Sequence, residues 1–334
     1  MQIILNGFGE YLGEKNTEIL TISENREVKK EIPIYEVDEL YLMDGNSVST
    51  SALSLCALYD IPIMLLSHTG KILSMNLPFN INGECRVKTR IAQYKSSNSI
   101  KGCEIAKNIL LSKINNQRQL LIKHNQTFSS ERIESRIFKI KEQPLIPELR
   151  NELNSLEGKA SEQYFKEYFN LIPKQFKPEK RESYKTQNKF NNLLNLGYEI
   201  LSAEIYKAVL LSHLDPYLGY LHGEQYLKPS LICDLIELFR FNIDEFLITY
   251  VQKLDLKESF ELNGNKPFLT PIEMKKYILE VSKTFDNTLL HQRIKKFGKR
   301  TKLRTIIKEE PIKLAQYLRE EKCEYAPFKL DNPS

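Results

Sequence analysis

Cysteine is scarce in this 334-residue chain, and long apolar runs are missing. The five cysteines are widely spaced and form no Cys-x-x-Cys pair, which argues against a disulfide framework and against a structural zinc site. No stretch approaches the roughly 20 consecutive apolar residues that a membrane span requires. The first residues also lack the basic and then apolar layout of a signal peptide, so we expect a cytoplasmic protein with no membrane attachment.

Two common catalytic motifs are absent as well. The chain has no Gly-x-x-x-x-Gly-Lys loop, and Gly7-Phe8-Gly9 is too short to match Gly-x-Gly-x-x-Gly, so an ATP-driven mechanism is not expected. It has no Gly-x-Ser-x-Gly elbow, so a Ser/His/Asp hydrolase is unsupported. The composition, with 41% hydrophobic and 27% charged residues, is that of a folded protein with a large core or two smaller ones.

The pattern of apolar residues predicts two parts of different class. Short strands separated by turns are expected over residues 2–5, 18–22, 39–42, 61–66 and 72–75, with one helix over 52–59. After a linker over 76–83, helical periodicity predicts long helices, among them 149–168, 190–211, 230–239, 271–285 and 289–307. We therefore predict an α+β protein with a small β-sandwich-like domain at 1–80 and a larger all-α domain at 81–334.

Charge differs between these two parts. Residues 1–80 carry 5 Lys and Arg against 11 Asp and Glu, whereas the rest of the chain carries 43 against 32. Residues 292–308 hold eight cations and no acidic residue, and within them a 3-4-4 helical spacing relates Arg293, Lys296, Arg300 and Arg304. A solvated helix surface would also explain such a run, but its one-sided charge favours nucleic acid binding through these four residues.

Carboxylates near a histidine form the most informative cluster. Asp234 and Glu237 stand three residues apart in a helical pattern with apolar flanks, so both lie on one face, and His222 occupies a preceding turn. Oxygen ligands with one imidazole suit Mg²⁺ or Mn²⁺. A further candidate is Glu157, which is followed by the small residue Gly158. Taken singly, each of these residues is explained equally well as a helix cap, an ion pair or a solvated side chain. Only the combination of all of them favours a metal site.

Several ordered segments together resemble one family, the metal-dependent CRISPR-associated adaptation integrase and endonuclease that inserts spacers into CRISPR arrays. The resemblance runs almost from end to end, and the segments that carry it include Ile32-Pro33-Ile34, Lys113-Ile114-Asn115-Asn116-Gln117, Leu156-Glu157-Gly158-Lys159-Ala160, Leu218-Gly219-Tyr220-Leu221-His222 and Asp234-Leu235-Ile236-Glu237. One departure is Asn188-Lys189, where relatives commonly have Asp-Pro, so this chain lacks that acid.

The resemblance implies a site, an activity and partners. Glu157, His222 and Glu237 would be the catalytic metal ligands, and Asp234 would act beside the metal through water or by orienting a ligand. The 3′-hydroxyl of a spacer DNA end would attack a phosphodiester of the array. The acidic β domain would serve dimerisation, and the implied partners are double-stranded spacer and repeat DNA, a second copy of the chain, and a small ferredoxin-like CRISPR-associated subunit.

Two other functions remain open from the sequence. One is a stand-alone metal-dependent nuclease that acts on branched or single-stranded DNA. The other is a non-catalytic DNA-binding scaffold in which His222 and Glu237 are structural. The partner subunit would separate the first from an integrase, and metal titration would separate the second.

Overall fold

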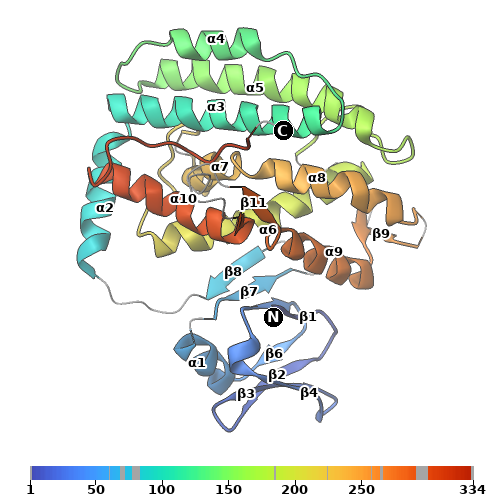
Figure 1. Ribbon diagram of the computed structural model, residues 1–334. Helices are drawn as coiled ribbons and strands as arrows, with labels where there is room; N and C mark the ends of the chain where they lie inside the picture. Colours follow the sequence, from blue (N-terminus) through green and yellow to red (C-terminus); the bar gives the residue numbers. More distant parts are fainter. Residues whose placement is uncertain are drawn as a thin grey trace. The chain divides into compact units, whose positions relative to one another are not determined.

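The computed structural model describes the chain except residues 1, 60, 68–71, 77–82, 184–185, 224, 257, 264–265, 291–299 and 332–334. The chain divides into two compact units. The first comprises Met1–Ile81 together with Asp255–Glu280, and the second comprises Asn82–Leu254 and Val281–Ser334. Figure 1 shows strands gathered in the first part of the chain and helices in most of the rest. The expected linker over 76–83 lies mostly outside the described residues.

Two four-stranded sheets form the first unit. One has the order β1-β5-β7-β8, in which β8 alone is antiparallel to its neighbour, and contains β1 (Gln2–Leu5), β5 (Glu39–Met43), β7 (Ile63–Leu66) and β8 (Ile72–Asn76). The other has the order β4-β3-β2-β6 and contains β4 (Glu27–Pro33), β3 (Ile19–Glu24), β2 (Tyr11–Lys15) and β6 (Ser47–Val48). A short 3-10 helix, η1 (Ile34–Glu36), follows β4.

One apolar core joins both sheets to the helix α1 (Thr50–Leu58). Leu5 and Leu40 from the first sheet and Leu12 and Leu20 from the second are fully buried in it. Ser49 caps α1, because its Oγ accepts a hydrogen bond from the backbone N–H of Ala52 at 3.1 Å. Two inner faces closing on one core make a sandwich, so the β-sandwich-like prediction is confirmed. A hairpin of β9 (Phe260–Asn263) and β10 (Lys266–Leu269) also belongs to this unit.

Helices dominate the second unit, as predicted. They are α2 (Gly83–Ser96), α3 (Ile100–Lys123), α4 (Glu131–Lys139), α5 (Pro147–Tyr168), α6 (Lys189–Leu211), α7 (Ser230–Ile236), α8 (Arg240–Tyr250) and α10 (Leu303–Leu318), with the 3-10 turns η2 (Phe169–Leu171) and η3 (Val251–Lys253). The helix α9 (Pro271–Thr284), most of which belongs to the first unit, matches the prediction for 271–285. Helix α3 packs against α5 and α8, and α6 packs against α7, α8 and α10. No described helix has the length and apolar character needed to cross a membrane.

In its described part, the structure has strands followed by a shorter helix where one helix was expected over 289–307. Strand β11 (Thr288–Leu290) pairs with β12 (Arg300–Lys302) in antiparallel register, and α10 begins only at Leu303. The N–H of Leu303 then bonds the carbonyl of Asn287 at 2.9 Å, which closes the pairing. The prediction came from helical spacing of apolar residues and charges, and such spacing does not report which backbone groups pair with another strand.

Candidate active site

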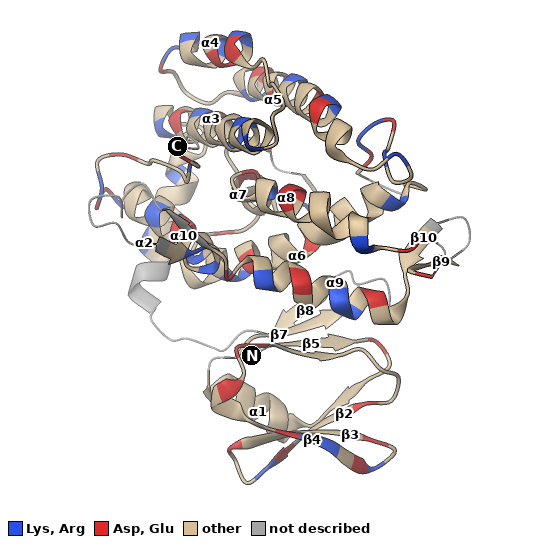
Figure 2. Cartoon of the chain, turned by 45° about the vertical axis from the view of Figure 1, so that its right-hand side comes forward, with Lys and Arg blue, Asp and Glu red and all other residues tan. Residues whose placement is uncertain are grey.

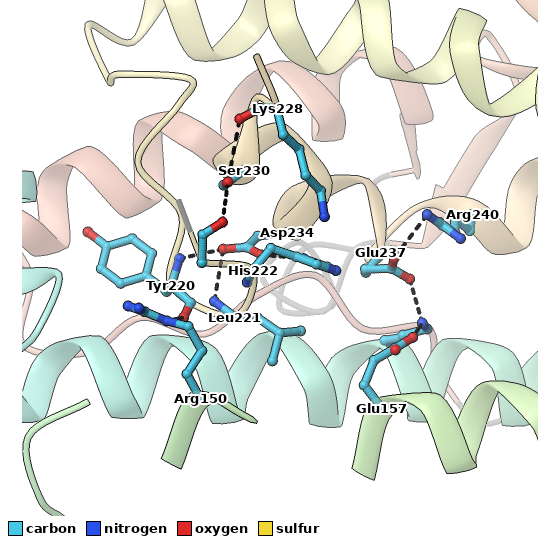
Figure 3. A network of polar contacts seen from close by, with 12 residues as sticks. Arg150, Glu157, Tyr220, Leu221, His222, Lys228, Ser230, Asp234, Glu237 and Arg240 are labelled. Atoms are coloured by element: carbon cyan, nitrogen blue, oxygen red, sulfur yellow. Dashed lines mark hydrogen bonds and ion pairs between the residues drawn. The ribbon is translucent and has the colours of Figure 1, made fainter. Parts of the chain in front are cut away.

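The carboxylate of Asp234 on α7 organises the loop that precedes this helix. Its Oδ2 accepts hydrogen bonds from the backbone N–H groups of Tyr220 (2.5 Å) and Leu221 (3.0 Å), and its Oδ1 accepts one from the N–H of His222 (2.8 Å). Asp234 is completely buried, so its charge depends on these donors. The loop is therefore wound around a single buried carboxylate (Figure 3).

The same carboxylate orients the imidazole of His222. Nδ1 of His222 lies 2.8 Å from Oδ1 of Asp234. Because an ionised carboxylate only accepts, Nδ1 carries the proton and Nε2 presents its lone pair. Figure 3 shows the ring extending from Asp234 toward Glu237. A ring nitrogen fixed in this way is the arrangement that proteins use for a metal-binding histidine.

Side chains from two other helices hold the loop on both sides of His222. Gln93 on α2 is fully buried, and its Nε2 donates to the carbonyls of Asp215 and Leu218, each at 2.9 Å. Arg150 on α5 donates from Nε to the carbonyl of Tyr220 at 3.0 Å. These side-chain donors place the loop, whose described residues between α6 and α7 belong to no named strand or helix.

Glu157 and Glu237 come from different elements and meet at one ammonium group. Glu157 lies on α5, and Glu237 follows the last residue of α7. Lys113 on α3 forms an ion pair with Oε1 of Glu157, and its Nζ lies 2.7 Å from Oε2 of Glu237. Nζ also donates to Oγ of Ser161 at 2.9 Å, and this hydroxyl donates to Oε1 of Glu157 at 2.8 Å. Two carboxylates thus share one buried cation.

This cation keeps Glu157 ionised. Burial acts to raise the pKa of the Glu157 carboxyl, but the charge of Lys113 and the hydrogen bonds from Lys113 and Ser161 outweigh it and lower the pKa to about 2. Glu157 is therefore a carboxylate at every physiological pH. It needs no proton loss before it can bind a cation.

Arg240, at the start of α8, holds the other oxygen of Glu237. Its Nη2 lies 3.0 Å from Oε1 of Glu237, and its guanidinium carbon lies 4.6 Å from the ring centroid of Tyr198. The hydroxyls of Tyr198 and Tyr164 both donate to the carboxylate of Asp244, which is completely buried. A chain of contacts therefore runs from Asp244 through Tyr198 and Arg240 to Glu237.

The donors at this site suit a hard divalent cation. Among the described residues, no three His, Cys, Asp or Glu side chains are already assembled around a common point for a metal ion. The donor types nonetheless fit Mg²⁺ or Mn²⁺, with two carboxylates and the Nε2 of His222. Oε2 of Glu237 is buried and accepts no hydrogen bond from any described residue, although Lys113 lies close enough to neutralise it. The place between the carboxylates is therefore built for positive charge, and the residues fit a divalent cation.

A cavity of about 710 Å³ opens beside Glu157. Ser161 and Arg240 line it together with Phe165 and Phe169. Four further cations line it as well, and they are Lys166, Lys177, Lys180 and Arg181. The two rings are buried and Glu162 and Glu179 also line the cavity, so its cations are the groups that suit the phosphates of a nucleic acid strand.

The four cations predicted to bind DNA are only partly described. Arg293 and Lys296 lie outside the described residues, and Arg300 lies in β12 with its side chain outside them. Arg304 lies on α10, where its guanidinium pairs with Glu204 at 3.1 Å and with Asp286 at 3.6 Å. Its charge is thus balanced within the protein. Figure 2 shows that basic residues also occur on α3, α4, α5 and α10, so positive charge is not limited to the predicted run.

Sequence reasoning gave no role to Lys113, Ser161 or Arg240. A signal existed for Lys113, because it continues the face of α3 that carries the buried residues Ile109 and Leu110, and a lysine on such a face needs a carboxylate partner. Asn188 has a role of its own: its Oδ1 accepts from the N–H of Asn191 at 2.9 Å and so caps α6. The amide therefore serves as the cap of α6.

Comparison with known proteins identifies the class that this fold and site define. Residues 3–283 match the family described as CRISPR associated protein Cas1. A CRISPR-associated endonuclease Cas1 from Korarchaeum cryptofilum is 30% identical over 268 residues, which cover 75% of this chain and 77% of that protein. The chain therefore belongs to the Cas1 family, the spacer-acquisition integrases, and the resemblance stated from the sequence is confirmed.

Solved structures share the fold. A structure described as "Casposase bound to integration product" superposes with a TM-score of 0.84 at 22% identity and covers 100% of this chain and 94% of its own. A second, described as "Cas6-RT-Cas1--Cas2 complex", gives a TM-score of 0.75 at 19% identity and covers 100% of this chain and 36% of its own. Family membership supports a CRISPR nuclease or integrase role for this chain.

Proposed function

We propose that this protein is a metal-dependent DNA integrase and endonuclease that inserts spacer DNA into a CRISPR array. The observation that carries the proposal is the meeting of Glu157 and Glu237 at one buried cation, with the oriented imidazole of His222 beside them. Glu157, Glu237 and Nε2 of His222 would hold Mg²⁺ or Mn²⁺. When bound, the divalent ion supplies Lewis-acid polarisation of the phosphodiester and charge stabilisation of the leaving oxygen.

The reaction exchanges one phosphodiester bond for another. The 3′-hydroxyl of the spacer end loses its proton as its oxygen forms a bond to phosphorus, the bond to the 3′-oxygen of the array strand breaks, and that oxygen takes up a proton, so no net proton is consumed. Because one such bond replaces another, the step needs no ATP, which agrees with the missing phosphate loop. Asp234 keeps the His222 ring oriented, and Arg240 keeps Glu237 oriented. The cations of the 710 Å³ cavity would neutralise the phosphates of the entering strand.

The proposal includes partners. Double-stranded spacer and repeat DNA are the substrates, and a second copy of the chain would form a homodimer through the acidic β-sandwich unit. A small ferredoxin-like CRISPR-associated subunit would bridge two such dimers in the cytoplasm. A solved complex named for Cas1 and Cas2 on the same fold supports the choice of a second CRISPR-associated protein.

A strand-transfer assay with the partner subunit tests the function. We expect Glu157→Gln, His222→Ala and Glu237→Gln each to abolish joining of a 3′-hydroxyl DNA end to a repeat-bearing plasmid in Mg²⁺ or Mn²⁺. Glu152→Gln is the matched control, because Glu152 also lies on α5 but forms only an exposed ion pair with Arg136 at 3.7 Å. Unchanged joining in the three variants would remove these residues from the site.

The same proteins also distinguish the integrase from the two other functions, a stand-alone nuclease and a non-catalytic scaffold. A stand-alone nuclease would cut branched or single-stranded DNA and would not join ends when the partner subunit is added. A non-catalytic scaffold would bind DNA but show no Mn²⁺ site that disappears in Glu237→Gln. Calorimetric titration of the wild-type protein with Mn²⁺ measures the second outcome directly.

A further inference from the structure

Lys113 occupies the place between the two carboxylates that the proposed function assigns to a divalent ion. Its side chain is 2% exposed, which is rare for a lysine. Its ammonium group meets three acceptors: one oxygen of Glu157, Oε2 of Glu237 at 2.7 Å and Oγ of Ser161 at 2.9 Å. The ammonium thus donates hydrogen bonds to Glu157 and Ser161 and pairs by charge with Glu237.

The ammonium of Lys113 also neutralises the repulsion between the two carboxylates. Two ionised carboxylates that approach each other inside a protein repel strongly unless a cation lies between them. Lys113 supplies that cation from a third element, α3, and so holds α5 and the end of α7 at the right separation. A divalent ion that takes the same oxygens would face the ammonium charge at short range. The two cations therefore compete for one place.

We propose that Lys113 is a counter-ion that holds Glu157 and Glu237 in place before metal binding. The metal must then displace the ammonium group of Lys113 from Oε2 of Glu237. Two neighbours make the exchange feasible. Arg240 stays bonded to Oε1 of Glu237, so this carboxylate keeps its orientation when Oε2 is released. Ser161 remains an acceptor for the ammonium, and it lines the 710 Å³ cavity. Lys113 thus sets how tightly the site binds metal.

Because it requires a metal at Glu157 and Glu237, this role of Lys113 rests on the proposed function. The test uses the full chain in three forms: wild type, Lys113→Met and the control Lys101→Met. Lys101 also lies on α3, but its ammonium pairs with the exposed Glu320 at 2.8 Å. The readouts are the Kd for Mn²⁺ by calorimetry and the Tm in chelator and in excess Mn²⁺.

We expect opposite effects with and without metal. In chelator, Lys113→Met should melt below wild type, because the carboxylates lose their counter-ion. It should bind Mn²⁺ at least about tenfold more tightly and gain more in Tm from Mn²⁺ than wild type does, because no ammonium competes. Lys101→Met should match wild type in Kd. A Kd for Lys113→Met equal to or weaker than that of wild type would overturn the competition.

Two further outcomes are decisive. If Lys113→Met folds only in Mn²⁺, the proposal is supported, because the metal then replaces the missing cation. If it folds in neither condition, Lys113→Arg decides: it keeps the charge and offers five N–H donors in place of three, so it should weaken Mn²⁺ binding, and unchanged or tighter binding would contradict the inference. If wild type has no Mn²⁺ site, or has one that Glu157→Gln does not remove, the proposed function itself is contradicted.

Discussion

Asn116 on α3 is tied to the backbone of Leu238, the residue that follows Glu237. Its Nδ2 donates to the carbonyl of Leu238 at 2.9 Å, and its Oδ1 accepts from the N–H of Leu330 at 2.7 Å. Asn116 is completely buried. Lys113 lies one helical turn earlier, so this side chain fixes the separation between Lys113 and Glu237.

We expect Asn116→Ala to destabilise the protein by about 1–3 kcal/mol, because it leaves buried backbone groups without partners. It should also weaken Mn²⁺ binding, because Glu237 would no longer be held against α3. Urea unfolding and calorimetry measure the two effects. Asn170→Ala is the control, since Asn170 makes only exposed contacts. Loss of stability with unchanged Mn²⁺ affinity would show that Asn116 does not position the site.

Replacing Asp234 should lower metal affinity without touching a metal ligand. In Asp234→Asn, the amide keeps one acceptor for the loop N–H groups but no longer has the charge that fixes Nδ1–H of His222. Loss of such a partner typically costs about 10–100-fold in metal affinity. The Kd for Mn²⁺ measures it, with Asp286→Asn as the comparison variant. An unaltered Kd would mean that the ring is held by other contacts.

Gly219 should not tolerate a methyl group. A Cβ at this position would lie 2.8 Å from the carbonyl oxygen of His222 and 2.8 Å from the carbonyl carbon of Ser230, and backbone atoms cannot give way as a flexible side chain can. We expect Gly219→Ala to cost about 1–3 kcal/mol of stability.

Gly158 is the control for this substitution. A Cβ there meets nothing within 4 Å, so Gly158→Ala in the interior of α5 should raise stability by about 0.5–1 kcal/mol. Thermal unfolding of both variants checks the pair. Equal melting temperatures for Gly219→Ala and wild type would contradict the packing described for the loop.

Asp244 should make stability depend on pH. Burial raises the pKa of its carboxyl to about 6 in spite of the hydrogen bonds from Tyr198 and Tyr164, whereas the ordinary value is 3.8. Because the folded state holds the proton more tightly, this contribution is fully present below pH 3.8 and is lost as the pH rises through 6.

The unfolding free energy of wild type relative to Asp244→Asn should therefore fall between about pH 4 and about pH 7, by up to about 3 kcal/mol. Urea unfolding of both proteins in chelator across this range gives the difference. Curves that run parallel from end to end would show that Asp244 titrates at its ordinary pKa.

The basic run should contribute to DNA binding through counter-ion release. We expect joint replacement of Arg293, Lys296 and Arg300 by Ala to weaken DNA binding and to reduce the slope of log K against log salt by up to about 3. Arg304→Ala is the informative comparison. Since Glu204 and Asp286 already hold that guanidinium, it should lower stability and change the slope little. A slope that the triple variant leaves unchanged would make the run a solvated surface.

Local chemistry was enough to predict much of the fold. Ser49 and the apolar residues after it predict a helix, and the structure has α1 there with Ser49 as its cap. The strands at 2–5 and 39–42 follow from short apolar segments between turns. Strand β2 was missed, and so was β4, whose residues are almost all exposed and therefore show no alternation of apolar side chains.

The sequence by itself determined the fold class and membership of the family, because these depend on patterns within short segments, and only the tertiary structure decided that Asp255–Glu280 belongs with the first unit. Only the tertiary structure decided that Lys113 lies between Glu157 and Glu237, residues 44 and 124 positions away along the chain. It also decided that the residues before α10 pair as strands. Such outcomes depend on which elements pack together, and the partner of a buried charge or a backbone donor is chosen by that packing and not by its neighbours in sequence.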